Sequence, residues 1–211
     1  MKWEELLHKV GNEPVFRTGF LAASDESLAE LRRQLSRWIK SGRLIQLKKG
    51  LYTLATPYRK VTAHPFVLAN AMKKASYVST QSTLAYYGMI PEYVPAVTSV
   101  TTQRPEQVET PLGRFVFRHI KNDWFHSYKQ IELGSDQKAF VATPEKALLD
   151  LVYLTAGSDN YDFLAELRLQ NFERLNTDKV LALAEKSQSP KLRRAAEIIV
   201  KLAEEEKSEE L

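Results

Sequence analysis

The chain has 211 residues, of which 44% are hydrophobic, 27% are charged and none is cysteine. This composition is typical of a globular protein, and the length allows one large domain or two small ones with a buried core. The lack of cysteine excludes disulfides, thiol catalysis and thiolate metal sites. No apolar run approaches the roughly 18 to 20 residues of a membrane span, and the charged start MKWEELLHKV is not typical of a signal peptide, so we expect a cytoplasmic protein without membrane contact.

The net charge of +4 is unevenly distributed along the chain. Residues 1–60 contain twelve basic and six acidic residues, whereas residues 61–211 contain eighteen basic and twenty acidic residues. The window 31–60 holds nine lysines and arginines and no acid. This asymmetry is typical of a basic module that binds a polyanion and is joined to a body with another task. The alternative interpretation is a solvated face on which basic residues cluster by chance, because it would have the same composition.

Three helices are predicted at the N-terminus. Apolar spacing predicts the first over residues 3–10, and a short second helix is predicted over residues 18–22. The third follows Ser24 or Ser27 as N-cap, with Ser27 and Glu30 at the spacing of a capping box. Gly42 is expected to end it.

The third helix is amphipathic. One stripe along it, which we expect to face the other helices, contains Leu28, Leu31, Leu35, Trp38 and Ile39. The opposite side carries Arg33, Ser36, Arg37 and Lys40, with Arg32 at its edge. The apolar stripe therefore determines that a cationic side with one small hydroxyl faces outward. A structural helix whose polar side happens to be basic is the alternative interpretation.

Two short strands, RLIQL and LYTL, follow the third helix and are joined by KKG, where Gly50 allows the positive φ of a tight hairpin. Three helices followed by a hairpin is the order of a winged helix-turn-helix, in which the last helix enters the major groove and the hairpin reaches the flanking backbone. We therefore predict a winged helix-turn-helix over residues 1–56. Its candidate DNA-binding residues are Arg32, Arg33, Ser36, Arg37, Lys40, Arg43, Lys48 and Lys49. Arg33 and Arg37 are the better candidates for base edges, and Lys48 and Lys49, at the hairpin tip, for phosphates.

Residues 57–65 are predicted to be a linker, because TPYRKVTAHP has two prolines and no clear period. Residues 66–211 are predicted to be a second domain, so that the fold class is α+β. FVLANAMKKA reads as a helix, and YVSTQSTLAYYGMI as a short strand or turn that leads into another helix. A small, mainly antiparallel sheet is expected from four segments, AVTSVTT, RFVFRHI, SYKQIEL and KAFVAT. Several helices follow it, the first of them opened by Thr143 as N-cap and Pro144.

The second domain contains no clear sequence motif for catalysis or for metal binding. The four histidines have no partner at i, i+4 spacing, and His119, Asp123 and His126 are interpreted as solvated or hydrogen-bonded rather than as metal ligands. We expect neither a metal nor a cofactor, since the sequence has no glycine-rich phosphate loop either. A polar group that begins at Ser79 lacks a plausible base beside it, so helix capping by a hydroxyl is the simpler interpretation. Its members are Ser79, Gln81, Ser82 and Thr83.

Lys146 and Asp150 lie one helical turn apart and can form an ordinary surface pair. Asp150 is embedded in ALLDLVYL, however, where a buried carboxylate needs a partner. A structural ion pair is preferred over a catalytic one, and we do not expect an enzyme.

Three strings together resemble AbiEi-type antitoxins, bacterial regulators of abortive-infection and toxin–antitoxin operons. The first is LSRWIKSGRLIQLKKGLYTL. In that family, as in this segment, the recognition helix is followed by Gly-Arg-Leu, a basic hairpin and a final Gly-x-Tyr motif. YVSTQSTLAYYGMIPE and TPEKALLDLVYL match the pattern of the family's C-terminal domain in the right order. The resemblance covers most of residues 1–155.

The resemblance implies a transcriptional repressor that binds inverted repeats of double-stranded DNA in its own promoter. It also implies the antitoxin of a type IV system in phage defence, which counters a nucleotidyltransferase-like toxin without needing to hold it in a stable complex. Two other interpretations remain open. One is a stand-alone winged-helix regulator whose second domain binds a ligand or a protein, and the other is an enzyme acting on nucleotides or RNA with a basic targeting module.

Overall fold

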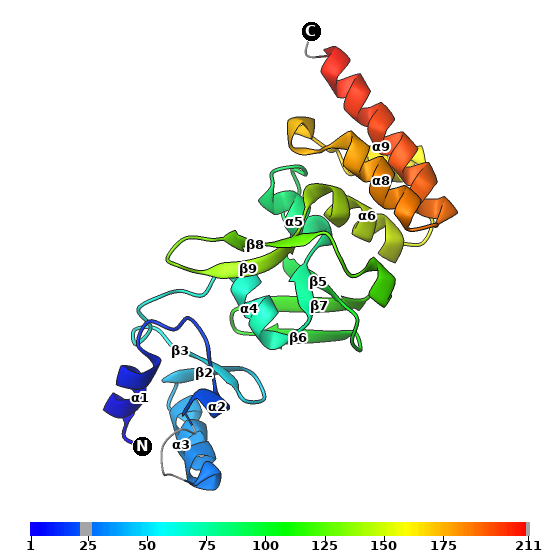
Figure 1. The fold of residues 1–211 in the computed structure, drawn as a ribbon. Coiled ribbons are helices and arrows are strands. Elements are labelled where there is room, and N and C mark those ends of the chain that lie inside the picture. The colour runs from blue at the N-terminus through cyan, green and yellow to red at the C-terminus, as the bar shows by residue number, and fades with distance from the viewer. Residues whose placement is uncertain (22–26, 210–211) are drawn as a thin grey trace.

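The computed structural model describes residues 1–21 and 27–209 (Figure 1). It is built from two α+β units, each with its own sheet. None of the helices in these described residues combines the length and the apolar character that crossing a membrane requires.

Helices packed on a small antiparallel sheet form the N-terminal unit. Its elements are α1 (Trp3–Val10), β1 (Phe16–Arg17), α2 (Thr18–Leu21), α3 (Leu28–Lys40), β2 (Leu44–Lys48) and β3 (Leu51–Leu54). Strand β3 lies between β1 and β2 and is antiparallel to both. The three helices and the hairpin therefore occur in the expected order. Ser24 as a cap, and residue 22 as the end of α2, lie outside the described residues.

The core of this unit fixes how α3 is rotated. Ser27 is its N-cap, and its Oγ accepts a hydrogen bond of 3.2 Å from the backbone N–H of Glu30. Leu31 and Leu35 are buried in a cluster with apolar residues of α1 and α2. Leu28 was expected in this stripe, and that prediction is wrong, because the side chain is 50% exposed at the first position of the helix. The buried side of α3 begins one turn later and includes the polar Gln34.

The C-terminal unit has a six-stranded sheet flanked by helices. Its strands are β4 (Ser76–Val78), β5 (Ala96–Thr101), β6 (Glu106–Thr110), β7 (Gly113–His119), β8 (Tyr128–Glu132) and β9 (Lys138–Ala142), in the order β6-β7-β5-β4-β9-β8. Its helices are α4 (Pro65–Met72), α5 (Thr80–Tyr86), α6 (Pro144–Leu154), α7 (Tyr161–Glu166), α8 (Thr177–Lys186) and α9 (Pro190–Glu209). Short 3₁₀ helices span Asn122–Trp124 and Phe172–Arg174.

The sheet is mixed, so the expectation of a mainly antiparallel sheet holds for three of its five strand pairs and is wrong for the other two. Strand β5 is parallel to β7, and β4 is parallel to β9, while the other neighbours are antiparallel. The difference arises because β6 intervenes in the chain between β5 and β7 and pairs only with β7 at the edge. The strand β6 was not predicted, since its sequence EQVET is mostly polar.

Two apolar layers cover the two faces of this sheet. One cluster joins β4 and β5 to α5, α6 and the C-terminal helices, and it includes Tyr77, Val100 and Leu148. The other lies under α4 and includes Phe66, Phe115 and Val141. Figure 1 shows α8 and α9 stacked beyond α6, at the opposite end of the molecule from α3.

The hairpin of the N-terminal unit packs against the C-terminal unit. Leu47 and Leu51 are 3% and 2% exposed and belong to the same apolar cluster as Phe66 and Phe115. The segment predicted to be a linker is itself held in place, because the side chain of Gln137 accepts from the backbone N–H of His64 at 2.8 Å and donates to the carbonyl of Thr62 at 3.0 Å. The two units are therefore joined by packing as well as by the chain.

Replacement of Leu51 by Ala tests this shared core. Loss of a fully buried leucine leaves a cavity, so Leu51→Ala is expected to lower the free energy of unfolding by about 2–5 kcal/mol in urea denaturation. Leu181→Ala, at a side chain that is 41% exposed, is the matched control and should change it by about 0.5 kcal/mol or less. Equal effects of the two substitutions would show that the hairpin is not packed on the C-terminal unit.

Candidate nucleic-acid interface

The outer side of α3 is cationic, as its sequence predicts, and it lies in solvent. Its five candidate residues are all exposed: Arg32, Arg33, Ser36, Arg37 and Lys40. They are opposite the buried Leu31 and Leu35, as the helical wheel predicts. This side of α3 can therefore meet a partner without unfolding any part of the N-terminal unit.

Glu30 adds an acid to this face that the sequence reasoning missed. Its carboxylate lies 3.1 Å from the guanidinium of Arg33 and 3.7 Å from that of Arg37. The capping-box prediction assigned this side chain to the helix N-terminus, but it reaches along the helix to the arginines instead. The sequence did contain a signal for this ion pair, because Glu30 and Arg33 are three residues apart on a helix. Exposed pairs of this kind contribute about 0–1 kcal/mol, so both arginines can exchange Glu30 for a phosphate or a base edge.

Arg43 is held at the C-terminal end of α3 by an aromatic cluster. Its guanidinium lies 5.3 Å from the ring centroid of Trp3, which is the geometry of a cation–π contact. Trp3 in turn packs edge-on against Trp38 at 5.2 Å and against Tyr58 at 5.1 Å. The half-buried Arg43 is therefore a fixed positive charge rather than a free one.

Lys48 departs from the expectation that it is a free cation at the hairpin tip. Its ammonium donates to both carboxylate oxygens of Glu106, on β6 of the C-terminal unit, at 2.8 Å each. A bulge in β2 explains the direction of the side chain, because the register shifts between Gln46 and Lys48 and leaves Leu47 to fill the shared core. Lys49, the next residue, is exposed.

Glu106 also accepts from the Lys73 ammonium at 2.6 Å. Burial alone would raise the pKa of Glu106, but the hydrogen bonds from Lys48 and Lys73 outweigh it and hold that pKa below its usual value. No local sequence signal could have revealed this triad, since the carboxylate lies far along the chain from both lysines.

A buried polar cluster occupies the centre of the C-terminal unit. Asp150 pairs with Lys146 on the same helix and accepts hydrogen bonds from the hydroxyls of Ser79 at 2.7 Å and Tyr77 at 3.1 Å. All four residues are fully buried. The predicted ion pair is thus present and buried, and the alternative of a surface pair is wrong. The prediction that Ser79 caps α5 through its hydroxyl is also wrong, because that hydroxyl donates to Asp150.

The cluster serves to join β4 to α6. Burial lowers the pKa of Lys146, against the opposing effect of Asp150, and burial together with Asp150 raises the pKa of Tyr77. The Lys146 ammonium also lies 4.1 Å from the ring centroid of Trp124. None of these atoms is open to solvent, so the Ser79 hydroxyl cannot reach a substrate in this conformation.

His119 and His126, which were considered as metal ligands, each form a hydrogen bond with a protein group. Nδ1 of His119 lies 3.1 Å from the carbonyl oxygen of Gln103, and Nδ1 of His126 lies 2.8 Å from the hydroxyl of Ser127. Within residues 1–21 and 27–209, no three His, Asp or Glu side chains gather as a metal site requires.

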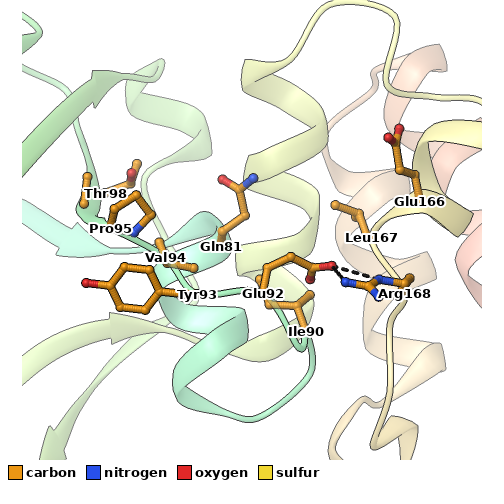
Figure 2. Close-up of a pocket in the computed structure, with 11 residues that line it drawn as sticks. Gln81, Ile90, Glu92, Tyr93, Val94, Pro95, Thr98, Glu166, Leu167 and Arg168 are labelled. Atoms are coloured by element: carbon orange, nitrogen blue, oxygen red, sulfur yellow. Dashed lines mark hydrogen bonds and ion pairs between the residues drawn. The ribbon is translucent and has the colours of Figure 1, made fainter.

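A cleft of about 650 Å³ lies between α5, the start of β5 and the end of α7. It is lined by Gln81, Ile90 and Thr98 and by residues 92–96 and 166–168. Figure 2 shows Glu92 and Arg168 joined beside it, and the Arg168 Nε donates to Glu92 at 2.9 Å. This hydrogen bond lowers the pKa of Glu92. Tyr93 extends from the adjoining segment and is 88% exposed. The lining is mainly apolar with a few polar groups, which is typical of small-molecule sites.

Comparison of the sequence with protein-family models and with curated proteins gives no match. The functional interpretation therefore depends on the exposed face of α3, on the buried cluster and on the cleft.

Replacement of Asp150 tests the role of the buried cluster. Asp150→Ala leaves the Lys146 ammonium buried without its carboxylate, so we expect the free energy of unfolding to fall by about 3–5 kcal/mol in chemical denaturation. The double variant Lys146→Met, Asp150→Leu removes both charges and should recover most of that loss. If the double variant is as unstable as the single one, the cluster contributes through something other than charge pairing.

Proposed function

We propose that this chain is a sequence-specific DNA-binding transcriptional repressor and the antitoxin of a type IV toxin–antitoxin operon, which represses its own promoter by binding inverted repeats. The observation that carries the DNA-binding part is the exposed cationic face of α3, opposite a buried apolar stripe. Duplex DNA presents closely spaced phosphates, and such a face supplies the lysines and arginines that neutralise them.

The order of elements supports a winged helix-turn-helix as the DNA-binding module. Helices α1, α2 and α3 are followed by the β2–β3 hairpin, and β1 between α1 and α2 pairs with β3. In this module α3 is the recognition helix, and the hairpin lies on the flanking backbone. Arg33 and Arg37 read base edges, while Lys40, Arg43 and Lys49 contact phosphates.

The arrangement of the C-terminal unit supports the antitoxin part. The two strings that resemble AbiEi-type antitoxins there are distant in sequence, yet they meet in one buried cluster. Tyr77 and Ser79 of the first string donate to Asp150 of the second. Contact between the two segments makes them parts of one structural unit. The functional partner of this unit is a nucleotidyltransferase-like toxin, which the antitoxin counters without forming a stable complex.

A stand-alone regulator with a ligand-binding C-terminal unit is the second candidate function. The cleft beside Glu92 and Arg168 favours it, because its size and mainly apolar lining suit a small organic molecule. The gene beside this one separates the two functions. Rescue of growth by this protein, when a toxin encoded by that gene is expressed, supports the antitoxin, and the absence of any such toxin supports the stand-alone regulator.

A gel-shift experiment with the DNA directly upstream of the protein's own gene tests repression most simply. We expect a retarded band that persists in excess random duplex, since specific sites are typically bound about 10³–10⁷ times more tightly than non-specific DNA. Loss of the band at low competitor concentration would contradict autoregulation.

Arg37→Ala tests the assignment of a base contact. We expect a loss of about 1–3 kcal/mol in binding to the upstream site and a smaller loss on random duplex, measured by fluorescence anisotropy. Arg193→Ala, an exposed cation on α9 paired with Glu185, is the matched control and should change neither. Equal losses on the two duplexes would make Arg37 a phosphate contact.

A further inference from the structure

The contact between Lys48 and Glu106 joins the proposed DNA-binding module to the C-terminal unit. Glu106 receives hydrogen bonds from two ammonium groups, Lys48 at 2.8 Å and Lys73 at 2.6 Å. The Glu106 carboxylate resembles a DNA phosphate, because both are anions with oxygens that accept hydrogen bonds from a lysine. Lys48 can therefore bind either of them.

The two lysines are held very differently. The Lys73 side chain is 8% exposed, and its ammonium also donates to the carbonyl of Arg104 at 2.7 Å. The Lys48 side chain is 36% exposed and has Glu106 as its ion-pair partner. Removal of Lys73 from the carboxylate would leave a buried charge, whereas Lys48 can move its ammonium into water.

We propose that Glu106 occupies Lys48 in the free protein and releases it to a DNA phosphate on binding, while Lys73 keeps the carboxylate compensated. Glu106 is thereby an internal competitor that weakens binding to DNA. This inference rests on the proposed function, because it assigns a regulatory contact to the same DNA-binding module.

The exchange requires little rearrangement of the hairpin. Leu47 and Leu51 stay in the shared core, so only the Lys48 side chain rotates. Because Glu106 lies on an edge strand of the C-terminal unit, any event that shifts β6 relative to the hairpin changes the availability of Lys48. The C-terminal unit can in this way adjust DNA affinity without touching DNA.

The test is binding of the full chain to a labelled random duplex at several salt concentrations, followed by anisotropy. Glu106→Gln is expected to bind about two- to fivefold more tightly than the unaltered protein, since the competing charge is removed. Lys48→Ala is expected to bind more weakly and to reduce the slope of log K against log salt by about 0.9, the loss of one phosphate contact. In the Lys48→Ala background, Glu106→Gln should have no further effect.

Glu109→Gln is the matched control, because it removes one negative charge from the same strand at a carboxylate that is 79% exposed. It should change affinity much less than Glu106→Gln does. Circular dichroism checks that each variant is folded. Glu106→Gln removes the partner charge of Lys73. If this variant does not fold for that reason, the double variant Lys73→Met, Glu106→Gln, which also removes the buried ammonium, replaces Glu106→Gln in the same measurements.

The outcomes separate this inference from the function on which it rests. If the unaltered protein binds DNA and Lys48→Ala leaves affinity and salt slope unchanged, the exchange is refuted while DNA binding stands. Weaker binding by Glu106→Gln would refute it as well, since Glu106 would then position the hairpin rather than compete for it. If the unaltered protein binds no duplex, both proposals fall.

Discussion

Burial of Leu31 and Leu35 is the constraint from which the functional interpretation follows. These side chains join apolar residues of α1 and α2 and leave α3 only one rotation about its axis. The arginines and the lysine on the opposite side are then exposed, and Glu30 forms ion pairs with Arg33 and Arg37 on the same face. A polar face of this kind incurs no desolvation cost in folding, because its charges stay in water. The same apolar packing that stabilises the N-terminal unit thus leaves its cationic side in solvent.

A second constraint couples this surface to the rest of the molecule. The hairpin that follows α3 buries Leu47 and Leu51 in the core under α4, and the bulge in β2 directs Lys48 to the carboxylate on β6. A unit on a free linker would tumble independently of its neighbour. Here the shared core and the triad around Glu106 orient the module on the C-terminal unit. Regulation of one unit by the other therefore needs only a local change at this junction.

The sequence predicts local features well and long-range ones poorly, for physical reasons. Caps and periodicity predict the bounds of α1 and the Ser27, Thr143 and Pro144 start signals, because these depend on neighbours within one or two turns. The order of the strands depends on distant pairings, so the parallel contact of β5 with β7 and the polar edge strand β6 were not foreseen. The site shows the same division. The exposure of Arg33 and Arg37 follows from helix geometry. The contact between Lys48 and Glu106 could not be predicted, because no local pattern links two residues so far apart in the sequence.

The central claim is that the outer face of α3 meets DNA, and proximity measured in the complex tests it most directly. A photocrosslinking residue introduced at Ser36, between Arg33 and Arg37 on the exposed face, is illuminated in the presence of labelled upstream duplex. The same residue at Glu197, exposed on α9 at the far end of the molecule (Figure 1), is the comparison. The account predicts a crosslink from position 36 and none from position 197. Crosslinks from position 197 alone, or from neither position while the duplex is bound, would contradict it.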